Sequence, residues 1–98
     1  MQKFEITNAE GGSAVPVKLT LNAATNKITQ KDLEAVYIDL SVDADPEAVD
    51  HALTEFLAKT LEVSADKLAI ASGKAVDKKV VIILSLTPDQ IEERLSVS

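Results

Sequence analysis

Apolar and polar residues alternate along two stretches in the first half of the chain, and a period of two predicts half-buried β-strands. The apolar positions are Val15, Val17, Leu19 and Leu21 in residues 14–21, and Val36, Ile38, Leu40 and Val42 in residues 35–42. Pro16 predicts that the first strand lies at an edge of its sheet or begins there. Residues 22–32 between the two strands are polar and contain turn-forming asparagines, so they predict a long hairpin connection.

The spacing changes to that of a helix over residues 45–63, where apolar residues fall on one stripe. Asp45 is suited to be the N-cap of this helix, and Pro46 suits its first position. A second, shorter helix is predicted over residues 86–95, because Thr87 and Gln90 have the spacing of a capping box. The predicted core stripe of the first helix consists of Val49, Ala52, Leu53, Phe56, Leu57, Thr60 and Leu61.

Two further apolar segments, residues 67–72 and 78–84, predict two more strands separated by a turn that contains Gly73. The order β-β-α-β-β-α predicts an α+β fold of two layers, in which a four-stranded, mostly antiparallel sheet carries both helices on one face. Residues 14–98 are expected to form this single domain. Residues 1–13 are expected to be an N-terminal extension or an edge strand, and the alternation of Phe4 and Ile6 favours the strand.

The composition is that of a globular domain, with 46% hydrophobic and 27% charged residues in a chain of 98. The net charge of −6 disfavours nucleic acid as a partner, because like charges repel. The absence of cysteine excludes disulfides and thiolate chemistry. No apolar stretch is long enough to cross a bilayer, and the N-terminus shows no export signal, so we expect a cytoplasmic protein without a membrane partner.

The pair Gly73–Lys74 raises the question of a phosphate-binding loop. Such a loop needs a glycine five residues earlier and a helix directly after the lysine. Position 68 is Leu, and a strand is predicted next, so the pair is interpreted as part of a hairpin turn. The alternative is a weak anion-binding site formed by Ser72, Gly73, Lys74, Lys78 and Lys79.

No combination of residues in the sequence indicates a catalytic or metal site. Glu47, His51 and Glu55 share one face of the first predicted helix, but that face is opposite the apolar stripe and is expected to be solvated. The stretch from Asp43 resembles the start of an EF-hand but has Ala48 where glycine is required. We therefore expect a protein that is not an enzyme and that uses neither a metal nor a cofactor.

The last predicted strand offers one argument for function. Side chains alternate across a strand, so either Val81 and Ile83 or the set Val80, Ile82 and Leu84 must point away from the helices. If neighbours such as Tyr37 do not shield them, they would form a surface for a partner or a dimer. The favoured hypothesis is a non-enzymatic protein-interaction module with an unidentified protein partner, existing as a monomer or weak homodimer. The alternative is a weak anion or nucleic-acid binder that uses the lysines around Gly73.

Three segments of the chain resemble the YggU-like family of small uncharacterised proteins: "VKLTLNAATNKI", "EFLAKTLEVSADKLAIASGKAVDKKVVI" and "LTPDQIEERL". The resemblance implies a two-layer fold of two strands, a helix, two strands and a helix, and it implies no activity. This chain departs from the family pattern at several positions. It has residues 47–50 in place of Gly-Lys-Ala-Asn, Val76–Asp77 in place of Ser-Arg, Leu21 in place of a proline, and Glu62 in place of a helix-ending glycine. Lys79 is retained.

Overall fold

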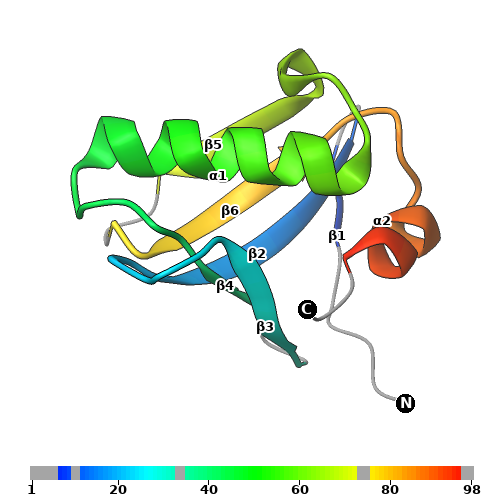
Figure 1. Ribbon diagram of the computed structural model, residues 1–98. Helices are drawn as coiled ribbons and strands as arrows, with labels where there is room; N and C mark the ends of the chain where they lie inside the picture. The colour runs from blue at the N-terminus through cyan, green and yellow to red at the C-terminus, as the bar shows by residue number, and fades with distance from the viewer. Residues whose placement is uncertain (1–6, 10–11, 33–34, 73–75, 96–98) are drawn as a thin grey trace.

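The computed structural model describes residues 7–9, 12–32, 35–72 and 76–95, which form a small α+β domain of one mixed sheet and two α-helices (Figure 1). Phe4 and Ile6, for which a strand was predicted, lie outside the described residues. A short strand does precede the first predicted one. The elements in chain order are β1 (Thr7–Ala9), β2 (Gly12–Thr20), β3 (Lys27–Lys31), β4 (Val36–Asp39), α1 (Pro46–Leu61), the 3₁₀ turn η1 (Ala65–Lys67), β5 (Leu68–Ser72), β6 (Lys78–Ile83) and α2 (Pro88–Arg94).

The sheet has the strand order β3-β4-β2-β6-β5, with β1 paired to β2 beside this path. The predicted α+β class with two helices agrees with the described residues, but these form six strands where four were predicted. β3 forms within the polar stretch that was expected to be a connection, and its single large apolar residue, Ile28, is fully buried. β4 pairs antiparallel with β3 and lies between β3 and β2. It is parallel to β2, whereas the other pairings are antiparallel as expected.

Pro16 was expected at a sheet edge or at the start of a strand, but it lies within β2, which is the central strand of the sheet. On one side β2 pairs with β6. On its other side it pairs first with β1 and then with β4. The pairing with β1 ends at Ala14, and the pairing with β4 begins at Val17. Pro16 lies between the last residue paired with β1 and the first residue paired with β4. Its missing N–H therefore removes no hydrogen bond from the strand pairings that the structure describes.

The core lies on one face of the sheet, and both helices contribute to it. α1 runs across the sheet with α2 near its C-terminal end (Figure 1). Four residues of the predicted stripe of α1 are buried, Val49, Leu53, Leu57 and Leu61, whereas Ala52, Phe56 and Thr60 are only partly buried. Ile91 and Leu95 extend the same core from α2. None of the helices in the described ranges is long and apolar enough to cross a membrane.

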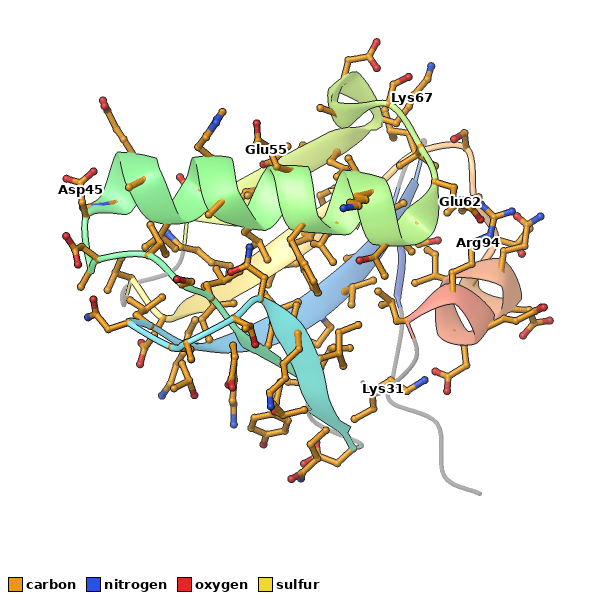
Figure 2. All side chains as sticks on the ribbon, in the orientation of Figure 1. Lys31, Asp45, Glu55, Glu62, Lys67 and Arg94 are labelled. Carbon is orange, nitrogen blue, oxygen red and sulfur yellow. The ribbon has the colours of Figure 1, made fainter. Side chains whose placement is uncertain are left out.

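The predicted N-terminal caps of both helices are confirmed. The Asp45 carboxylate accepts a hydrogen bond from the Ala48 N–H at 3.0 Å, and Thr87 and Gln90 form the reciprocal capping box. Glu62 ends α1 in the left-handed conformation, with φ 59° and ψ 46°. Figure 2 shows Asp45 and Glu62 at the two ends of α1, with Arg94 of α2 beside Glu62. Arg94 links α2 to α1, because its Nη1 donates a hydrogen bond to the Leu61 carbonyl at 2.7 Å.

Candidate functional site

The residues of the hypothetical anion site do not converge within the described part of the chain. Gly73 and Lys74 lie outside the described residues, and Ser72 ends β5. Lys78 and Lys79 are adjacent on β6 and therefore point to opposite faces of the sheet. Lys78 is exposed, whereas Lys79 is buried on the core face. One anion cannot contact both ammonium groups.

Lys79 has a partner inside the protein. Its side chain is 5% exposed, and its Nζ lies 3.3 Å from the Oδ1 of Asp50 on α1. The contact is electrostatic, because Asp50 Oδ1 accepts no hydrogen bond from the residues that the structure describes. A buried ammonium group next to a carboxylate is neutralised locally. Lys79 therefore links β6 to α1, and its ammonium group already faces a carboxylate of this chain.

Sequence reasoning left open which residues of β6 face the helices, and it did not pair Lys79 with Asp50. The register decides both questions. Val81 lies opposite Val15 of β2, and Lys79 lies opposite Val17, so these residues share the core face. Once Val81 and Ile83 face inward, the alternation of a strand brings Lys79 to the same face. The sequence shows that side chains alternate along this strand, but the strand register was needed to decide which of them face the core.

The opposite face of the sheet is covered by neither described helix, and we call it the open face. Val80 is the one large apolar side chain among the described residues that counts as exposed, with 38% of its surface accessible. Its cross-strand neighbours are Pro16 on β2 and Ala71 on β5. Ile82 is half-buried between Ala14 and Ala69. Small residues around two larger ones give this part of the open face a shallow apolar surface.

One end of the open face is basic. Lys18 of β2 lies directly opposite Lys78 of β6 in the antiparallel register. Lys18 Nζ also lies 5.5 Å from the ring centroid of Tyr37, within range of a cation–π interaction. Like charges directly across a ladder destabilise a sheet by a few tenths of a kcal/mol or more, roughly 0.2–1.

The face of α1 considered for a metal is solvated. His51 Nε2 lies 3.1 Å from Glu55 Oε1, and both side chains are largely exposed. The described residues hold no cluster of three histidine, aspartate or glutamate side chains able to bind a metal ion. This pair is an ordinary surface contact between residues four apart on a helix.

Two of the hollows on the described surface are shallow and open. One, of ≈ 530 Å³, lies between α1 and the loop before β3, and its charged groups, Glu55 and Lys59, belong to exposed helix positions. The other, of ≈ 510 Å³, lies at the C-terminal end of β2 beside Val76 and Asp77. The hydroxyl and charged side chains that line them are Glu55, Lys59 and Thr60 in the first hollow and Thr20 and Asp77 in the second.

A comparison with protein-family models and with curated proteins found no match to this chain.

Proposed function

We propose that this protein is a non-enzymatic interaction module that binds a partner protein on the open face of its sheet. The observation that carries the proposal is the position of Val80. It is the exposed large apolar residue of the described chain, and it lies at the centre of a strand whose inward neighbours are completely buried. With the neighbouring Pro16 and Ala71 and the half-buried Ile82, Val80 forms a contiguous apolar surface on the open face, and such a surface supports a contact with a partner.

The charges on the open face suggest the chemistry of the partner. The chain as a whole has a net charge of −6, yet Lys18 and Lys78 place two positive charges side by side at one end of the apolar surface. A partner segment that offers apolar side chains followed by carboxylates would match both parts. Such complementarity contributes mainly to specificity and association rate.

We include membership of the YggU-like family and a cytoplasmic location in this proposal. The support for the family is the resemblance of the sequence segments together with the α+β arrangement of the described residues. The departures at residues 47–50 include Asp50, which neutralises the retained Lys79. This pairing also weighs against the alternative, an anion or nucleic-acid site around Gly73, because it occupies one of the proposed lysines.

Site-specific photo-crosslinking tests the open face. A benzophenone amino acid replaces Val80 in one variant and His51 in a matched control, since His51 is 75% exposed on the opposite side of the molecule. In cells, we expect one dominant protein adduct from position 80 and its absence from position 51. The double variant Lys18→Glu, Lys78→Glu should reduce the adduct. Equal adducts from both positions, or none from position 80, would overturn the proposal.

A further inference from the structure

β5 forms one edge of the sheet, since β6 is its neighbour in the strand order (Figure 1). The Leu84 N–H donates to the Lys67 carbonyl at 2.8 Å, which fixes the alternation of the ladder. In an antiparallel ladder, every second residue directs both of its main-chain groups to the same neighbour. Ala69 and Ala71 therefore bond toward β6, and the main-chain groups of Leu68, Ile70 and Ser72 point toward the edge.

The main-chain donors and acceptors at this edge can pair with the same groups of a second copy, with Ile70 at the centre of the pairing. The Leu68 N–H is already used, because it donates to the Ala65 carbonyl in η1. The remaining outward groups that can pair across the edge are the carbonyl of Leu68, both groups of Ile70, and the N–H of Ser72. A second β5, antiparallel and with Ile70 opposite Ile70, would make two reciprocal bonds between the Ile70 residues. It would also make two bonds from Ser72 N–H to Leu68 carbonyl. This pairing does not require the Leu68 N–H, which already donates to the Ala65 carbonyl.

The side chains of β5 lack the features that normally protect an edge. The strand contains no charge and no proline. Its Leu68 and Ile70 are half-buried against the core, while Ala69 and Ala71 are exposed. The opposite edge is different. β3 carries Lys27 and Lys31 and has an irregular register between Ile28 and Gln30. Charges and bulges are the devices that prevent sheets from joining at their edges.

We propose that a second copy of this chain pairs with β5 around a two-fold axis at Ile70, so that two sheets become one continuous sheet. Ala69 of each copy would lie opposite Ala71 of the other, where small side chains leave room for close approach. The dimer would be weak, because one short strand and its neighbours bury less than the roughly 1,200 Å² of a stable interface. Each copy carries a net charge of −6, so salt should strengthen the dimer by screening repulsion.

Sedimentation equilibrium and amide hydrogen exchange test this proposal on the full chain. Between about 10 µM and about 1 mM, a range suited to small interfaces, we expect a reversible shift from monomer to dimer. The Ile70 and Ser72 amides should become protected only at the higher concentration. The Ala69 and Ala71 amides bond to β6 and should be protected at both concentrations, which makes them internal controls. A monomer throughout the range, or a dimer that leaves the Ile70 amide unprotected, would overturn the proposal.

A proline substitution provides the second test. Ser72→Pro removes the N–H that would donate to Leu68 of the second copy, and that N–H does not point toward β6. We expect dimerisation to weaken roughly tenfold, as for the loss of two hydrogen bonds. The matched control, Ser72→Ala, keeps the main-chain N–H at this position and should leave the affinity within about twofold. A folded Ser72→Pro variant that dimerises normally would contradict the proposal. If this variant unfolds, the exchange measurement decides alone. Crosslinking from Val80 is independent of both results, so the two proposals can fail separately.

Discussion

Lys79 of β6 and Asp50 of α1 form an ion pair across the core face of the sheet, with 3.3 Å between Nζ and Oδ1. The two partners differ in environment, because the lysine side chain is 5% exposed and the aspartate side chain is 39% exposed. The loss of either partner therefore has a different consequence. Without Asp50, a buried ammonium group remains unpaired, whereas without Lys79 a carboxylate remains that water can reach.

We expect Asp50→Ala to lower the free energy of unfolding by about 2 kcal/mol, less than a fully buried pair would lose because water screens Asp50. Lys79→Met should cost less, since it leaves no buried charge. The double variant should recover most of the stability that Asp50→Ala loses. Urea denaturation of the four proteins gives the coupling energy. Lys78→Met is the matched control and should change stability by no more than about 0.5 kcal/mol. Equal losses from Asp50→Ala and Lys78→Met would show that the pair does not stabilise the fold.

The end of α1 contains a residue in an unfavourable conformation. Glu62 adopts φ 59°, a region in which a side chain is strained and glycine is not. We expect Glu62→Gly to raise the free energy of unfolding by about 1 kcal/mol. Glu62→Gln is the control for charge at a helix C-terminus. If glutamine stabilises as much as glycine does, the gain comes from the helix dipole and the strain argument is wrong.

Gly12 begins β2 at a close approach to the end of β6. A Cβ at this position would lie 2.8 Å from Leu84 Cδ2 and 2.9 Å from the Ile83 carbonyl oxygen. The carbonyl belongs to the ladder and cannot move without breaking it. We expect Gly12→Ala to destabilise the protein by about 1–3 kcal/mol. Thermal unfolding measures this, with the neighbouring Ala14→Gly as a comparison. A Gly12→Ala variant as stable as the parent would mean that the strand end accommodates the methyl group.

The anion-site alternative can be tested by NMR. Because Lys79 is buried against Asp50, inorganic phosphate or a short RNA duplex should leave the side-chain resonances of Lys79 unchanged at low and at moderate salt. Exposed Lys78 serves as the comparison within the same spectrum. Salt-sensitive shifts of both lysines at low phosphate concentration would restore the anion site and would require Asp50 to release Lys79.

Local interactions explain which features could be predicted without the structure. The cap at Asp45 and the capping box at Thr87 depend on residues within one helical turn of each other. The buried stripe of α1 follows from helical spacing. The family resemblance placed Glu62 where a helix-ending glycine is usual, and Glu62 does end α1 in the left-handed conformation. Each of these features involves neighbours in the chain, so each is visible in a short stretch of sequence.

Strand pairing and the environment of charged groups depend instead on residues far apart in the chain. β3 was missed because four of its five residues are polar, and only the fold buries Ile28 beside Ile38. The pairing of Lys79 with Asp50 and the position of β5 at the edge of the sheet could not be predicted either, because both depend on residues far apart in the chain. Alternation in the sequence by itself determined that β6 has two faces, and the tertiary structure decided which one faces α1. Periodicity defines faces relative to the strand, whereas only packing decides which face leaves the water.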